Sequence, residues 1–261
     1  MKYEIVSSTW ASFSRAVAAA AIGTWLVFAT CPASFAADGA QAAAAAKEAA
    51  AKLKAFLGDL EKSKRQPNYS KPPASDYLKR IFDTDVLAAL PAPKADDFDW
   101  LGDWVDSVAR TYVAMITFGA KDLADQIVGR NMIDYQDNTF PAAAFTLRLS
   151  ARMVSTMALY SNSLPPDKRK QAHEGIEQSS RGLVQIAMGM AGFIRIRLKL
   201  ENVRLTAAAL RDTVTVWAPL ATPNERAELL ARLEKARAAN ADAGIDKDVT
   251  AISTVIRQSS N

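Results

Sequence analysis

Three arginines and one glutamate in the second half of the chain have a spacing that suits ligand binding. Arg197, Arg204 and Arg211 recur every seven residues, and Glu201 lies between the first two. Seven residues make about two turns of an α-helix, so the arginines share one flank, with Glu201 close to the apolar face. A guanidinium fork is suited to hold a carboxylate or a phosphate. We therefore take Arg197, Glu201, Arg204 and Arg211 as the candidate binding residues.

Three interpretations of this cluster are open. The one we favour is an ordinary ladder of intrahelical salt bridges on the surface, in which each pair contributes about 0.3–0.5 kcal/mol. The second is a buried charge network, because Asp212 also falls on the apolar face. The third is a site for an anion or a partner, whose binding would relieve the repulsion between the arginines.

The remaining side chains give little support for catalysis or metal binding. His173 is the only histidine and Cys31 the only cysteine, so a transition-metal site or a Ser-His-Asp triad would depend on one residue. The sequence contains no HExxH, CxxC, GxSxG or glycine-rich phosphate loop. We interpret His173 as a solvated side chain and predict no catalytic residue, no metal ligand, no cofactor and no enzymatic activity. A hydrolase based on two carboxylates stays open, because Asp and Glu are plentiful.

The candidate residues belong to a long span, residues 165–217, which we predict to be helical and central. Fifty helical residues would reach about 75–80 Å, whereas a compact domain of this size is roughly 45 Å across. We therefore expect a bend near residues 189–192. Residues 194–200 alternate between apolar and basic side chains, as in a strand, but no partner strand is evident, so we predict helix there too. One apolar face contains Ile176, Ser180, Leu183, Ala187, Met190, Ile194, Leu198, Leu205 and Val216.

Helical periodicity and capping signals extend to the rest of the chain. The most specific start signal is Thr222-Pro223-Asn224-Glu225, a capping box with proline at the first helical position. Asp137-Asn138-Thr139 before Pro141 indicates the end of one helix and the start of another. We predict an all-α fold, a helical bundle of about six to eight helices. Besides the long span, the expected helices cover approximately residues 76–90, 96–120, 121–136, 141–162, 222–240 and 246–258.

The first 36 residues have the pattern of a secretory signal peptide. Lys2 and Arg15 precede an apolar stretch, and Ser34-Phe35-Ala36 has small residues at the positions required for cleavage. We expect cleavage after Ala36, which would leave no cysteine and no stable membrane span. An uncleaved anchor at residues 16–37 and lipidation of Cys31 are the weaker alternatives.

After the signal, we expect residues 37–75 to form an alanine-rich helix and a proline-containing linker, and residues 76–261 to form the helical-bundle domain. The first half of the alanine-rich helix has almost nothing to bury, so we expect it to fray or project. In the next domain, Asp96, Asp99, Asp103 and Asp106 form a stripe flanked by Trp100. We interpret the stripe as a solvated face that complements the helix dipole, with a docking surface for a cationic partner as the alternative.

Charge and export together restrict the classes of function that fit the sequence. The formal net charge is +4, but an exported chain meets envelope components rather than nucleic acid, and no base-stacking motif is present. We predict a periplasmic helical-bundle protein that binds another cell-envelope protein and performs no chemistry. The alternatives are a binder of a small anionic ligand through the arginines and a carboxylate-based wall hydrolase. The alternative location is a periplasm-facing protein anchored in the membrane by its N-terminus.

Overall fold

The protein is a stack of helices. The computed structural model describes residues 37–194 and 198–259, and every regular element in these two ranges is helical. The prediction of an all-α bundle is confirmed. The described chain holds nine α-helices of eight residues or more, slightly above the expected number, in part because the long span is divided. The α-helices are α2 (Ala37–Lys62), α3 (Ala74–Ile81), α4 (Thr84–Ala89), α5 (Phe98–Ile116), α6 (Gln126–Asp134), α7 (Gln136–Ser163), α8 (Pro166–Phe193), α9 (Leu200–Trp217), α10 (Pro223–Ala239) and α11 (Asp246–Gln258), with short 3-10 turns η1 (Ala95–Asp97), η2 (Ala218–Leu220) and η3 (Ala241–Ala243) between them.

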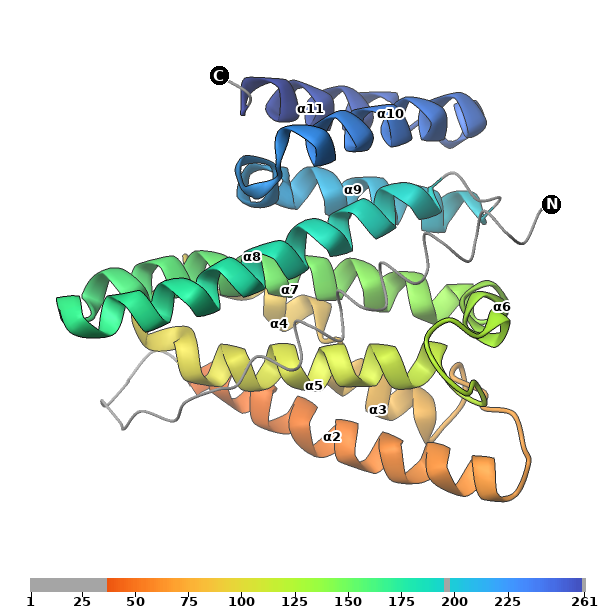
Figure 1. Ribbon diagram of the computed structural model, residues 1–261. Coiled ribbons are helices and arrows are strands. Elements are labelled where there is room, and N and C mark those ends of the chain that lie inside the picture. The colour runs from red at the N-terminus through yellow and green to blue at the C-terminus, as the bar shows by residue number, and fades with distance from the viewer. Residues whose placement is uncertain (1–36, 195–197, 260–261) are drawn as a thin grey trace.

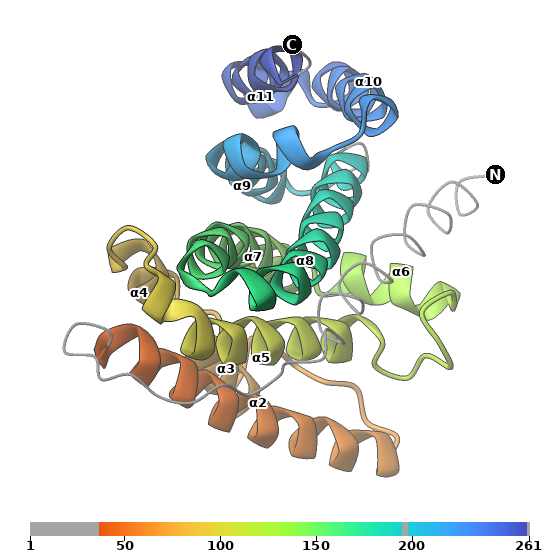
Figure 2. The same ribbon diagram turned by 60° about the vertical axis from the view of Figure 1, so that its left-hand side comes forward.

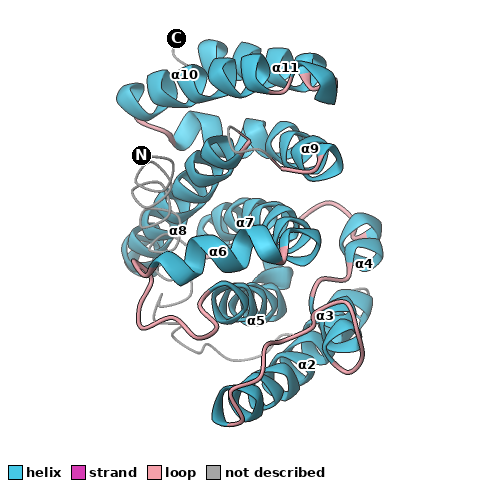
Figure 3. Cartoon of the chain, turned by 90° about the vertical axis from the view of Figure 1, so that its right-hand side faces the viewer, coloured by secondary structure: helices cyan, strands magenta, loops and turns pink. Residues whose placement is uncertain are grey.

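The helices lie in layers, with α7 in the middle. Helices α2 and α3 form the outer layer at one end, α5 lies on them, and α10 and α11 close the other end (Figures 1 and 2). Viewed along its length, α7 lies between α5 on one side and α9 on the other (Figure 3). Successive helices thus run back and forth across the molecule and pack against helices that precede them.

Helix α7 contributes to both apolar cores of the protein. Phe145, Leu149 and Met153, each four residues from the next, pack with α2, α3 and α5 in one core cluster. A second set on the same helix, including Leu147 and Val154, packs with α8, α9, α10 and α11 in the other cluster. These two sets of residues form two buried faces of the same helix. Small residues of α7 in the second cluster, which allow close approach, are Ala142, Ala143, Ala144 and Ala151.

The predicted long span, residues 165–217, is confirmed in part. It is helical on both sides of a break, but it forms two helices rather than one bent helix: α8 ends at Phe193 and α9 begins at Leu200. The break therefore falls just beyond residues 189–192. Figure 1 shows α9 running back past α8 in the opposite direction. The length argument predicts a bend, and the observed reversal is sharper than a bend; it keeps two long helices within a compact domain. The helix predicted across residues 194–200 is wrong at residues 194, 198 and 199, which lie between α8 and α9. Residues 195–197, in the middle of the alternating stretch, lie outside the described residues.

The expectation that the first half of α2 frays or projects is wrong. Ala43, Ala46 and Ala49 are each at most 2% exposed and belong to the core cluster shared with α5. Alanine buries little area by itself, but its small side chain lets the neighbouring helix approach closely, and that proximity excludes water. The proline-containing connection is also held, since Tyr69 is 1% exposed and its hydroxyl donates to the carbonyl O of Met115 at 3.3 Å.

Pro141 lies inside α7 rather than at its first position. The helix begins five residues earlier, at Gln136. Proline has no backbone N–H, so α7 lacks one intrahelical hydrogen bond at this position. Thr139 secures the junction with α6, because its hydroxyl donates to the carbonyl O of Met132 at 3.0 Å.

A buried amide closes the C-terminal end of α5. The side-chain nitrogen of Asn131, on α6, donates to the carbonyl O of Ile116 at 3.0 Å and to that of Phe118 at 2.8 Å. The last carbonyls of a helix have no partner within the helix itself. Asn131 is 5% exposed, so water cannot easily replace it.

We expect Asn131→Ala to lower the free energy of unfolding by about 2 kcal/mol, because it leaves two buried carbonyls without a donor. Urea denaturation monitored by circular dichroism measures this loss. Asn162→Ala is the matched control, since the Asn162 side chain is exposed and its removal should change stability by less than about 0.5 kcal/mol. Equal effects of the two substitutions would contradict the capping role.

Candidate functional site

The candidate residues on α9 lie in different surroundings. Glu201 is exposed in the first turn of α9, where a negative charge complements the helix dipole. The Arg204 side chain turns to η3, and its Nε donates to the carbonyl O of Ala243 at 2.8 Å. Arg211 lies two turns further on and reaches α11. Arg197 lies outside the described residues. The exposure of Glu201 removes the interpretation of a charge cluster buried around this carboxylate.

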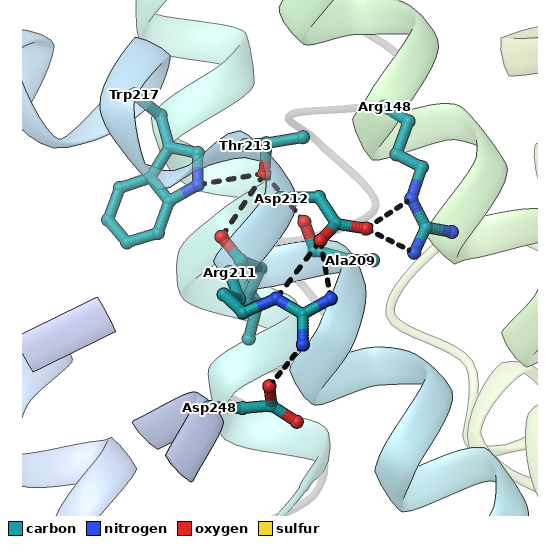
Figure 4. A network of polar contacts seen from close by, with 8 residues as sticks. Arg148, Ala209, Arg211, Asp212, Thr213, Trp217 and Asp248 are labelled. Atoms are coloured by element: carbon teal, nitrogen blue, oxygen red, sulfur yellow. Dashed lines mark hydrogen bonds and ion pairs between the residues drawn. The ribbon is translucent and has the colours of Figure 1, made fainter. Parts of the chain in front are cut away.

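Arg211 belongs to a network of four charged residues from three helices (Figure 4). Its Nη1 donates to Asp248 Oδ1 on α11 at 2.5 Å, and its Nε and Nη2 donate to Asp212 Oδ1 at 3.1 and 2.7 Å. The other oxygen of Asp212 accepts from Arg148 on α7, at 3.2 Å from Nε and 2.8 Å from Nη2. Asp212 is thus held between two arginines, and the network joins α7, α9 and α11.

The electrostatics of the network favour the charged forms of Asp212 and Arg211. Partial burial raises the pKa of the Asp212 carboxyl, but the hydrogen bonds and charges of Arg148 and Arg211 outweigh it and hold this pKa below its ordinary value. Hydrogen bonds to Asp212 and Asp248 raise the pKa of Arg211. The Asp212 side chain is 37% exposed and that of Asp248 18%, so solvent screens these pairs only in part.

The neutral side of α9 beneath the network is buried. The indole of Trp217 is fully buried, and its Nε1 donates to Thr213 Oγ1 at 3.1 Å. The Thr213 hydroxyl in turn donates to the carbonyl O of Ala209 at 2.8 Å. These contacts fix the rotation of the helix turn that carries Asp212 (Figure 4). The buried side of α9, to which Thr213 belongs, therefore fixes the position of the neighbouring Asp212 and of the charged network.

The network is better suited to linking helices than to binding a ligand. All three guanidinium nitrogens of Arg211 are engaged by carboxylates, and the network contains two arginines and two aspartates, which leaves no excess charge to attract an anion. Arg204 differs, because its observed partner is a carbonyl rather than a carboxylate. Of the two predicted arginines that the structure describes, Arg204 is thus the one without a carboxylate partner in this network.

Sequence reasoning identified Arg211 and noticed Asp212 but missed Arg148 and Asp248. These two residues lie 64 and 37 positions from their partners. Periodicity along one helix reports neighbours three or four residues apart, so it carries no information on such pairs. Only the order of packing of α7, α9 and α11 brings them together.

His173 and the carboxylates do not assemble into a recognisable centre. His173 is exposed near the start of α8, and Glu177, four residues on, forms an ion pair with Arg181. Within the ranges that the structure describes, no three His, Cys, Asp or Glu side chains are arranged to hold a metal ion.

Comparison with protein families, with curated proteins and with solved structures finds no match. Among the described helices, none combines the length and the apolar character needed to cross a bilayer. The class of the protein is therefore defined by its fold alone, as an all-α helical bundle.

We expect Asp212→Asn to lower the free energy of unfolding at pH 7 by about 1 kcal/mol, a value reduced for partial exposure. Because the pKa of Asp212 is lowered in the folded protein, its stabilising effect is present above the unfolded pKa, about 4, and is lost as the pH falls through the native value. The difference between parent and variant should therefore shrink as the pH falls below about 4.

Urea unfolding at several pH values measures this difference, with Asp242→Asn, at an exposed position in η3, as the control. A difference between parent and Asp212→Asn that is independent of pH would show that the ion pairs do not cause it.

Proposed function

We propose that this chain is an exported, periplasmic helical-bundle protein that serves the cell envelope as a non-enzymatic binding module. The proposal rests on the observation that charged side chains of the protein are paired with one another. Arg148, Arg211, Asp212 and Asp248 bind one another across three helices. Such a network supports a rigid scaffold, whose function then depends on its outer surface. The export pattern of residues 1–36 supports the location.

The partner that we propose is another protein of the envelope. A chain with a C-terminal tag, expressed from its own leader and crosslinked in intact cells, should retain one specific protein through stringent washing. The same chain without its leader should not retain it, because it would stay in the cytoplasm. Recovery of no protein specific to the exported form, in repeated captures, would contradict the proposed role.

Export is testable by itself. We expect material from the periplasm to begin at Ala37 on N-terminal sequencing, because the small residues before this position fit the peptidase. Replacing Ala36 with a bulky residue, as in Ala36→Leu, should block cleavage and leave the chain attached to the membrane. Periplasmic protein that still begins at Met1 would contradict cleavage.

Binding of a small anion is the second candidate, and Arg204 favours it. Its guanidinium meets a carbonyl rather than a carboxylate, so its positive charge is available to an incoming anion. Citrate or phosphate at about ten times its dissociation constant should raise the melting temperature by about 3–6 °C.

This shift should vanish in Arg204→Met and persist in Arg257→Met, a substitution at an exposed arginine of α11. The same shift in all three proteins would indicate a general ionic effect and contradict a site at Arg204.

A further inference from the structure

The first half of α2 covers the surface that the sequence suggested as a docking site for a cationic partner. Asp103 of the α5 acidic stripe forms an ion pair with Lys47 of α2 at 2.9 Å. The ring of Trp100, beside that stripe, lies against Gly39, where an added Cβ would be only 2.7 Å from the indole. The chain thus supplies its own occupant for this surface, a helix of small residues with one cation.

The two halves of α2 are held with unequal strength. In the second half, Leu53, Leu57 and Leu60 are buried, and the Glu61 carboxylate accepts from the backbone N–H of Gly119 at 3.3 Å. The first half has alanines on its inner face. Each leucine buries far more apolar area than an alanine, so the second half is fixed more strongly to the bundle.

The other contacts of the first half are also weak. The Lys47–Asp103 pair is well exposed, at 66% and 60%, and exposed pairs add little stability. The indole Nε1 of Trp100 is buried without an acceptor among the described residues, which is unfavourable when the surface is covered. The closed arrangement therefore has little to hold it beyond close packing of small residues.

The first half of α2 can leave this surface without unfolding as a helix. Residues 42–51 are mostly alanine, the residue with the highest helix propensity. Glu48 and Lys52 form an ion pair one turn apart, at 2.5 Å, which also stabilises an isolated helix. Opening thus exposes Trp100 and frees Asp103 from its ion pair with Lys47 at little conformational cost.

We propose that residues 39–50 of α2 are a lid over the Trp100–Asp103 surface of α5, which opens while the rest of the bundle stays folded. The uncovered surface accepts a small-residue helix with a cation, similar to α2 itself, from a partner. The identity of this partner rests on the proposed binding function, whereas the opening of the lid does not.

Hydrogen exchange of the full chain tests the opening. Amides of residues 43–50 should exchange at least about 100-fold faster than those of residues 53–60, because the detached first half is held only by its own marginally stable helical hydrogen bonds, which open far more often than those of a packed helix. Equal protection of the two groups would overturn the lid.

Two glycine variants provide a matched pair. Leucine at position 39 collides with Trp100, whereas Gly58, on the same helix, has no atom within 4 Å of an added Cβ. Gly39→Leu should increase acrylamide quenching of tryptophan fluorescence and keep a single cooperative melting transition, and Gly58→Leu should resemble the parent. Loss of the whole fold in Gly39→Leu, with Gly58→Leu intact, would show that this half of α2 is an integral part of the core and overturn the proposal.

A peptide of residues 37–52 tests the uncovered surface. Titrated into ¹⁵N-labelled Gly39→Leu protein, it should shift the Trp100 indole resonance saturably. The parent and Gly58→Leu should require at least about tenfold more peptide, because their own lid competes at a millimolar effective concentration. An unshifted Trp100 resonance in Gly39→Leu, or equal shifts in all three proteins, would overturn the assignment of this surface. Neither result would affect capture of an envelope partner through another face, which tests the proposed function separately.

Discussion

The two-sided burial of α7 is the constraint on which the rest of the fold depends. One stripe of this helix, with Phe145 and Leu149, requires cover from the N-terminal helices, and another, with Leu147 and Val154, requires cover from the C-terminal ones. A helix with apolar residues on two faces cannot lie at the surface of a protein. The chain therefore builds a layer on each side of α7, and the reversal between α8 and α9 follows, because α9 must return to pack along it.

The charged network lies where these layers are in contact. Arg148 extends from α7 to Asp212 of α9, and Arg211 continues from α9 to Asp248 of α11. Apolar packing specifies distance between helices better than it specifies their rotation and register, since many apolar contacts are nearly interchangeable. Paired guanidinium and carboxylate groups have a fixed geometry. The network therefore contributes to the alignment of three helices, and this accounts for arginines on a helix that otherwise has a buried face.

The sequence predicted local structure well and tertiary pairing poorly. The Thr222–Glu225 capping box forms as predicted, because its signal and its contacts lie within four residues. The burial of Ala43 and Ala46 could not be inferred from their own helix, since it depends on the approach of α5. The candidate site shows the same difference between local spacing, which was predicted, and tertiary partners, which were not. Arg204 and Arg211 share a flank of α9, as their spacing indicated, but their partners Ala243 and Asp248 come from later elements.

The central claim is that the charged residues of α9 hold helices together. A double-mutant cycle on Arg211→Met and Asp248→Asn tests it most directly, because the cycle isolates the energy of this one contact between α9 and α11. Our account predicts a coupling energy of about 0.5–1 kcal/mol that is the same with and without added phosphate. Additive effects of the two substitutions, or a stabilisation of the parent by phosphate that Arg211→Met abolishes, would contradict it and assign Arg211 to a ligand.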